Sequence, residues 1–169
     1  MVQKIASLID ETLMAMNAHL HVQMTNEEKA YLDAHFELIQ IKKGEHLMNR
    51  GDEVCYLYYL EAGTIQLSFP DKGKREISAR FIEPKEFINF SLSHEEQLSH
   101  YNVKALEHSK VWRLSKHDFQ QLYDLSINFN KLARLHLEKS INQKIKRDRK
   151  STRQNSSHIT ISYAVFCLK

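Results

Sequence analysis

The chain has 169 residues, of which 42% are apolar and 27% are charged, with 4 glycines and 2 prolines. These proportions are typical of a folded domain with its own core, and they exclude a disordered, fibrous or collagen-like chain. The formal net charge of +3 at pH 7 does not by itself indicate a nucleic-acid-binding surface.

Two amphipathic helices are expected within residues 1–35. Apolar residues recur at helical spacing from Ile5 to Met16, which predicts a helix over about residues 3–17. Thr25 and Glu28 have the spacing of a capping box and predict the start of a second helix. Acidic residues within the first apolar stretch argue against a signal peptide, and no apolar run approaches the ~18 residues of a membrane span. We therefore expect a cytoplasmic protein without a membrane association.

Short strands are expected from residue 36 to residue 114. An apolar and aromatic run, Tyr56–Leu60, predicts a buried strand, and Val111–Leu114 predicts the last strand. Period-two alternation predicts further half-buried strands, whose inward-facing residues would be Ile65, Leu67, Phe69, Ile77, Ala79, Phe81, Tyr101, Val103 and Ala105. Strands at such regular, short spacing are typical of a sandwich or a rolled-up barrel.

Turns separate these strands. Lys42 to Gly44 and Asn49 to Asp52 interrupt the apolar pattern, and glycine is the residue that readily adopts a positive φ. The loop between the strands at 65–69 and 77–81 contains Gly73, which we expect at its left-handed position.

Helices are expected again over residues 115–147. Ser115 and Asp118 predict a helix start, with Phe119, Leu122 and Tyr123 on its inward face. A restart near Ser126 opens a longer helix to about Arg147. Apolar residues spaced by four form a slowly winding stripe along it, composed of Phe129, Ala133, Leu137, Ile141 and Ile145. Either a partner or the chain's own domain could cover this stripe.

Residues 148–169 differ from the rest of the chain. Apart from Gln154, they resemble the peptide encoded by a common sequencing-adapter oligonucleotide, which would make them a non-native tail. The alternative is a native strand over Ile159–Leu168. Without the tail, Lys+Arg falls from 24 to 20 and Asp+Glu from 21 to 20, so residues 1–147 carry no net charge.

The order of these elements and the spacing of several residues resemble a known family. Gly44, the Gly51-Asp52 pair, Tyr58, Gly63 and Pro84 match the effector domain of the catabolite-activator/FNR (CRP/FNR) family of bacterial transcription regulators over about residues 10–147. The resemblance implies an α+β fold, mainly β: a double-stranded β-helix, or jelly-roll-like β-roll, over 36–114, with N-terminal helices and a long C-terminal dimerisation helix.

The same resemblance implies partners. Family members are generally homodimers through the long helix, and they bind DNA through a C-terminal helix-turn-helix domain. Residues 148–169 lack the helix-turn-helix pattern, so we expect this chain to be truncated before that domain and to reach DNA only through it. The competing interpretation is a stand-alone ligand-binding or scaffold module of the same fold.

The family's ligand pocket can be aligned on two short segments of this chain. The first comprises Phe87, Ile88, Asn89 and Phe90, and the second comprises Ser99, His100 and Tyr101. Where cyclic-nucleotide-binding members have Gly-Glu, this chain has Asn89-Phe90, and where they have Arg-Ser it has Ser99-His100. The acid for the ribose and the arginine for the phosphate are both replaced. The resemblance therefore implies a degenerate cyclic nucleotide site with an unknown effector.

Other chemistries have less support in the sequence. The ten histidines do not have paired metal-ligand spacing, so we expect no metal or other cofactor and no cupin-like enzyme. An iron–sulfur cluster needs several cysteines, whereas Cys55 and Cys167 are the only two, and we expect Cys55 to be buried. The sequence also lacks a catalytic triad, a P-loop and a dinucleotide-binding fingerprint. We therefore expect a non-enzymatic regulator.

Overall fold

The computed structural model describes residues 4–16, 24–88, 98–135, 137–138, 141–142 and 145. The chain divides into two units, 1–132 and 133–169. The described part of the first unit contains the helices α1 (Ile5–Met16), α2 (Asn26–His35) and α3 (Lys116–Leu125), the strands of a β-roll, and the beginning of a further helix at 127–135. In the second unit, described residues 133–135, 137–138, 141–142 and 145 are helical.

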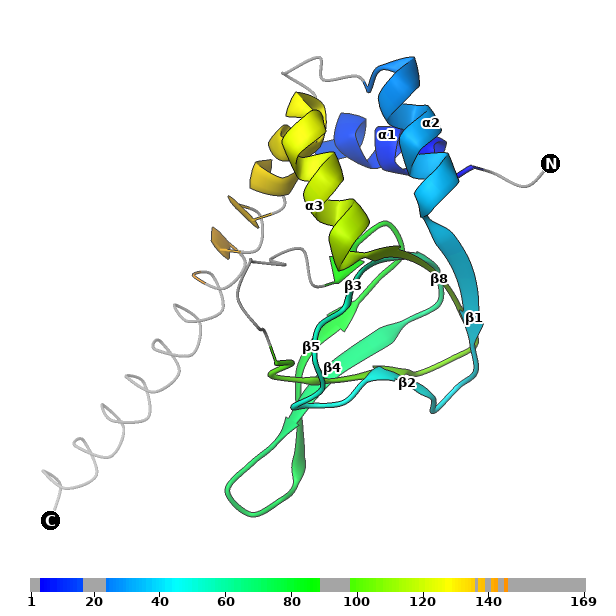
Figure 1. Cartoon of the computed structure of the whole chain (residues 1–169). Helices are drawn as coiled ribbons and strands as arrows, with labels where there is room; N and C mark the ends of the chain where they lie inside the picture. The colour runs from blue at the N-terminus through cyan, green and yellow to red at the C-terminus, as the bar shows by residue number, and fades with distance from the viewer. Residues whose placement is uncertain are drawn as a thin grey trace, which may run out of the picture. The chain divides into compact units, whose positions relative to one another are not determined.

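Two antiparallel four-stranded sheets form the β-roll (Figure 1). The first sheet has the order β1 (Glu37–Ile41), β8 (Ser109–Ser115), β3 (Tyr56–Ala62), β6 (Phe87–Ile88). The second has the order β2 (His46–Met48), β7 (Asn102–Ala105), β4 (Ile65–Pro70), β5 (Glu76–Ile82). The predicted fold of helices and antiparallel sheets is confirmed.

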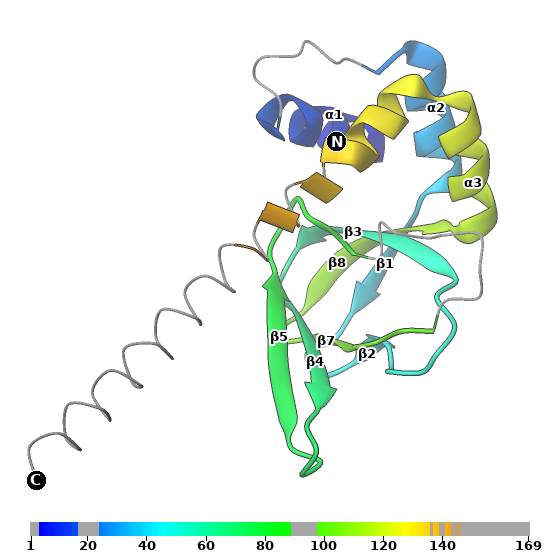
Figure 2. The same cartoon turned by 90° about the vertical axis from the view of Figure 1, so that its left-hand side faces the viewer.

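Helices α1, α2 and α3 gather at one end of the roll, and the β4–β5 hairpin projects at the other end (Figure 2). The Tyr59 hydroxyl on β3 contacts the Thr12 hydroxyl on α1 at 2.8 Å, and Tyr59 is completely buried. Lys85, in the turn before β6, pairs with Glu11 on α1 at 3.2 Å. Helix α1 is therefore fastened to the roll by a buried contact and a more exposed one.

Both predicted helix starts are confirmed. The Thr25 hydroxyl accepts a hydrogen bond from the Glu28 amide, and the Glu28 carboxylate accepts one from the Thr25 amide, which completes the capping box of α2. At α3 the Ser115 hydroxyl accepts from the Asp118 amide. These side chains satisfy backbone donors that have no partner inside a helix.

The helix expected after Ser126 begins as predicted. The buried Ser126 hydroxyl accepts a hydrogen bond from the Phe129 amide, and residues 127–135 are helical. The extension to about Arg147 stays a prediction, and the tail at 148–169 lies outside the described residues.

The prediction that Ile77 and Phe81 of β5 face the core is wrong. Ile77 and Phe81 are 43% and 53% exposed, whereas Ile82 is buried. The ladder with β4 shifts between Leu67, which pairs with Arg80, and Ser68, which pairs with Ser78. This bulge reverses the alternation for the residues that follow, because a slip of one residue moves every side chain to the other face.

Two further local predictions are also wrong. Lys74, with φ 62°, takes the left-handed position in the hairpin loop, whereas Gly73 has no positive φ. The Lys74 amide donates to the Asp71 carbonyl at 3.0 Å, which closes the turn at Lys74. On α3, Phe119 and Leu122 are buried as predicted, but Tyr123 is 45% exposed because it lies past the edge of the packed face.

Within the described residues, no helix is both long and apolar enough to cross a membrane.

Candidate functional site

The first predicted pocket segment lies in the core. Phe87 and Ile88 form β6 and are both buried, and they pair with Tyr59 and Tyr58 of β3. The Phe87 ring meets the Tyr59 ring edge-on, with centroids 4.9 Å apart. Burial raises the pKa of the Tyr58 and Tyr59 hydroxyls. Asn89 and Phe90, together with the loop at 93–97, lie outside the described residues.

The second predicted segment forms a tight turn before β7. The Ser99 hydroxyl donates to the Tyr101 carbonyl at 2.7 Å and accepts from the Tyr101 amide at 3.3 Å. The Ser99 backbone pairs with Asp52 and Gly51, at 2.8 Å in each case. His100 is exposed and Tyr101 is 39% exposed. Ser99, which the sequence prediction aligned with the family's arginine, therefore uses its hydroxyl to close its own turn.

The glycines that carry the family spacing have the expected backbone conformations. Gly44, Gly51 and Gly63 have φ values of 88°, 89° and 99°. Gly63 is also enclosed, because a Cβ added there would lie 2.8 Å from the Cα of Ser109. These residues shape the turns of the roll, and only Gly51, which donates to the Ser99 carbonyl, contacts a predicted pocket residue directly.

An ion pair that the sequence interpretation missed joins the edges of the two sheets. Nη2 of Arg80, on β5, lies 3.0 Å from both carboxylate oxygens of Glu86, which immediately precedes β6. The side chains of Arg80 and Glu86 are only 22% and 17% exposed. The simple alternation had placed Arg80 on the outward face. The bulge that turns Arg80 inward could not be recognised in the sequence, because it contains an alanine, whereas a glycine within a strand usually indicates a bulge.

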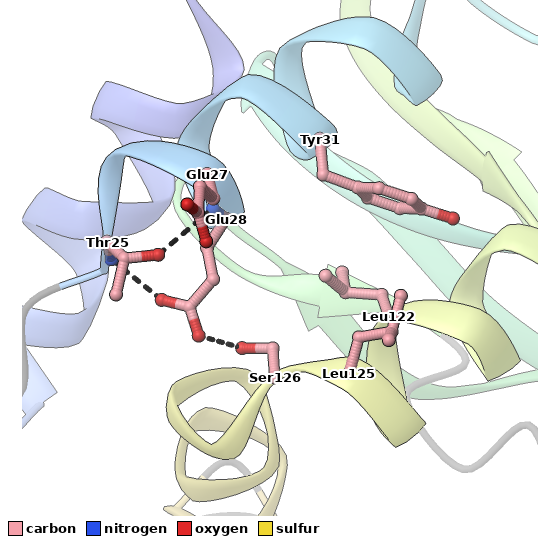
Figure 3. Close-up of a pocket in the computed structure, with 7 residues that line it drawn as sticks. All are labelled: Thr25, Glu27, Glu28, Tyr31, Leu122, Leu125 and Ser126. Carbon is pink, nitrogen blue, oxygen red and sulfur yellow. Dashed lines mark hydrogen bonds between the residues drawn. The ribbon is translucent and has the colours of Figure 1, made fainter.

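A cavity of about 380 Å³ lies between α2 and the end of α3 (Figure 3). It is lined by Thr25, Glu27, Glu28, Tyr31, Leu122, Leu125 and Ser126. Leu122 is buried, whereas Leu125 is 76% exposed. The sequence interpretation had treated these helices only as packing elements and gave no indication of this cavity.

Glu28 organises one wall of the cavity. One carboxylate oxygen accepts from the Ser126 hydroxyl, and the other accepts from the Thr25 amide at 2.7 Å and from the Asn128 side-chain amide at 3.0 Å. Burial alone would raise the pKa of the Glu28 carboxyl, but the hydrogen bonds from Asn128, Ser126 and Thr25 outweigh it and hold the pKa below its ordinary value of 4.5. The charged form of Glu28 therefore connects α2 to the start of the helix at 127–135.

The expectation that Cys55 is buried is wrong. Cys55 is a free, exposed cysteine, and its carbonyl accepts a hydrogen bond from the Lys116 amide. It immediately precedes β3, where the chain leaves the surface before the fully buried Leu57. In the part of the chain that the structure describes, no group of three His, Cys, Asp or Glu side chains could hold a metal ion.

The apolar stripe predicted to form a dimer interface is buried at its beginning and exposed further along. Phe129 and Ala133 are buried within the single chain. Leu137, Ile141 and Ile145 are 42%, 58% and 47% exposed. Of the five stripe residues, only these last three are exposed and could contact a partner. Their role in dimerisation stays a prediction.

Comparisons with known proteins agree with this architecture. The sequence profile of the family described as "Cyclic nucleotide-binding domain" matches residues 38–126, from β1 to the end of α3. No curated protein matches the chain by sequence.

Solved structures extend the similarity beyond the roll. The sensor domain of the transcriptional regulator DNR from Pseudomonas aeruginosa superimposes with a TM-score of 0.66 at 14% identity, covering 84% of this chain and 91% of that one. The Thermus thermophilus catabolite activator protein gives a TM-score of 0.63 at 21% identity, covering 83% of this chain and 63% of that one. The c-di-GMP-responsive regulator CLP of Xanthomonas campestris gives 0.64 at 17% identity, with 76% and 64% covered.

Proposed function

Because the chain belongs to the family of cyclic nucleotide-binding domains, we propose that it is the sensor and dimerisation part of a CRP/FNR-type transcription regulator. The observation that carries the proposal is the family match over 38–126, extended by a fold shared with sensor domains of such regulators. The proposed role is regulatory rather than catalytic, and the proposed compartment is the cytoplasm.

The proposal includes a degenerate cyclic nucleotide site. A phosphate is held most strongly by charge-assisted hydrogen bonds from an arginine, reinforced by backbone N–H groups. At the aligned position this chain has Ser99, whose hydroxyl is hydrogen-bonded to Tyr101 on both its donor and acceptor sides. A ligand would have to break this turn to use Ser99, which supports a different effector from the cyclic nucleotides of the family.

The proposal also includes a homodimer and a DNA-binding domain beyond this chain. The exposed side chains of Leu137, Ile141 and Ile145 support an interface between copies, since apolar residues repeated by four along a helix pack against a second helix. The chain spans 63% of the length of the catabolite activator protein and 64% of that of CLP, which supports a larger parent protein.

A gel-shift experiment tests this function. The product of the complete native gene, with the sequence that follows residue 147, is expected to bind its own promoter region specifically as a dimer at moderate salt. Competitor DNA of unrelated sequence should not displace it at equal concentration. Absence of specific binding would favour the alternative, a stand-alone ligand-binding or scaffold module of the same fold.

A further inference from the structure

Arg80 lies on the inner face of the roll. Directly paired residues of antiparallel strands project from the same face of a sheet. One such row crosses the second sheet from Met48 to Val103, then to Leu67, and ends at Arg80 on the edge strand β5. Met48 and Val103 are buried, so this row faces the core. Arg80 is therefore a cation at the end of an otherwise apolar inner row.

The next row confirms this direction for the Arg80 side chain. Ala105, Ile65 and Ile82 are paired in turn across β7, β4 and β5, and all three are buried. Ile82 lies two residues after Arg80 on the same strand, and residues two apart on a strand share a face. The intervening Phe81 is 53% exposed, as expected for a residue on the opposite face.

Glu86 engages only part of the Arg80 guanidinium. Nη2 donates to both Glu86 carboxylate oxygens, at 3.0 Å each. The N–H groups of Nε and Nη1 have no hydrogen-bond partner among the described residues. A structural ion pair with an arginine is commonly bidentate through two nitrogens, which uses the guanidinium more fully. The geometry at Arg80 instead leaves donors for another acceptor.

We propose that Arg80 is an effector-binding residue of this domain, and that it takes a small ligand carrying an oxyanion, either a phosphate or a carboxylate. The oxyanion would accept hydrogen bonds from Nε and Nη1 of Arg80. Glu86 balances the charge of Arg80 in the absence of ligand and competes with the incoming anion. This proposal rests on the proposed sensor function.

The two members of the pair have opposite predicted effects on binding. Removing Arg80 removes the cation, so affinity for an anion falls. Removing the charge of Glu86 removes a like charge next to the bound anion and frees Nη2, so affinity rises. A purely structural ion pair between the sheet edges predicts only lower stability for both variants, with no change in anion binding.

The test titrates the full chain with inorganic phosphate and, separately, with acetate, against sodium chloride at equal ionic strength, and follows amide chemical shifts. Wild-type protein is expected to show saturable shifts with at least one of the two anions, and the anion that binds more tightly identifies the ligand class. Arg80→Gln should weaken this binding about tenfold or more, and Glu86→Gln should strengthen it about threefold or more. Lys104→Gln, on the opposite face of the same sheet, should leave it unchanged.

Arg80→Lys serves as a second variant in case Arg80→Gln does not fold, because it keeps the charge but loses the fork of donors. It should bind more weakly than wild type. Absence of saturable shifts in wild type, equal binding by the arginine variants and wild type, or weaker binding by Glu86→Gln would overturn the proposal. Specific DNA binding by the complete gene product would be unaffected by such an outcome, so the two proposals fail separately.

Discussion

The backbone of Gly63, between β3 and β4, lies against Ser109 at the start of β8, and the space for a side chain at residue 63 is already occupied. Gly63 has a φ of 99°, and an added Cβ would lie 2.8 Å from the Ser109 Cα. Backbone atoms of a central strand cannot move away without breaking the ladder that β8 forms with β1 and β3. The glycine is required both for its conformation and for its lack of a side chain.

Gly63→Ala is therefore expected to lower the free energy of unfolding by about 3 kcal/mol, the sum of left-handed strain and overpacking. Gly44→Ala is the matched control, because Gly44 also has a positive φ but has nothing within 4 Å of an added Cβ. It should cost about 1 kcal/mol. Urea unfolding followed by circular dichroism measures both values, and equal losses would show that crowding by Ser109 is unimportant.

Tyr59→Phe tests how α1 is attached to the roll. The substitution removes the hydroxyl that contacts Thr12 at 2.8 Å and the Leu8 carbonyl at 3.3 Å. Loss of these buried hydrogen bonds should lower the free energy of unfolding by about 1 to 2 kcal/mol. Tyr123→Phe, at a side chain that is 45% exposed, should change it by less than about 0.5 kcal/mol. If the Tyr59 variant is as stable as wild type, these bonds do not fasten α1.

Glu28 gives a pH-dependent prediction. Its folded-state pKa lies below the ordinary value of 4.5, so its charged form stabilises the fold above that value and the contribution is lost as the pH falls towards the folded pKa. Glu28→Gln should therefore be clearly less stable than wild type at pH 7, and the difference should shrink below pH 4.5.

Chemical unfolding of wild type and Glu28→Gln at a series of pH values measures this difference. The control is Glu27→Gln, since Glu27 is the exposed neighbour on the same turn. The pH values should lie on both sides of 4.5, the ordinary pKa of a glutamate. If Glu28→Gln is destabilised as much below pH 4.5 as at pH 7, the assigned role of the Glu28 charge is contradicted.

Dimerisation gives a prediction for the second unit. Leu137→Lys and Ile141→Lys introduce charges at residues that are 42% and 58% exposed, and they should convert a dimer to a monomer because an unpaired charge is costly to bury between helices. Ile127→Lys is the control, because Ile127 is 72% exposed but does not belong to the stripe. Sedimentation velocity distinguishes the two states. A dimer that persists in both stripe variants would exclude this interface.

Cyclic nucleotides should not bind in the manner of the family's cyclic-nucleotide-binding members. Calorimetric titration of wild type with cyclic AMP and cyclic GMP is expected to give no sub-micromolar signal. In the proposed alignment Ser99 stands where those members have an arginine, and its hydroxyl closes its own turn. Sub-micromolar affinity for either nucleotide would mean that another group replaces that arginine, and Arg80→Gln would then show whether Arg80 is that group.

Many features of the fold could be predicted from local sequence. The capping residues Thr25 and Ser115 mark the starts of α2 and α3, because a cap depends on residues three apart in the chain. The positive φ values of Gly44 and Gly63 follow from the steric freedom of glycine in turns. The family spacing of such residues, together with the order of the flanking helices, therefore predicted the β-roll.

The candidate site was predicted less completely, because its geometry depends on contacts between distant segments. The role of Ser99 depends on its hydrogen bonds in the folded turn, which a comparison of residue types does not reveal. Glu28 was expected only as a capping residue, but it also binds Ser126 and Asn128, about one hundred positions away in the chain. Cys55 was expected in the core by its apolar neighbours, yet it lies exposed where the chain enters β3.

Local sequence predicted the helices α1, α2 and α3 and most of the longer strands, because capping, alternation and glycine spacing act over a few residues. It did not predict β6, whose two residues were expected in a ligand pocket. Only the tertiary structure decided which side of β5 faces the core. The strand has polar and apolar residues in alternation, and the bulge opposite Leu67 and Ser68 fixes the register. That register turns Phe81 to the surface and Arg80 to the interior, because pairing with a neighbouring strand decides the direction of every side chain on an edge strand.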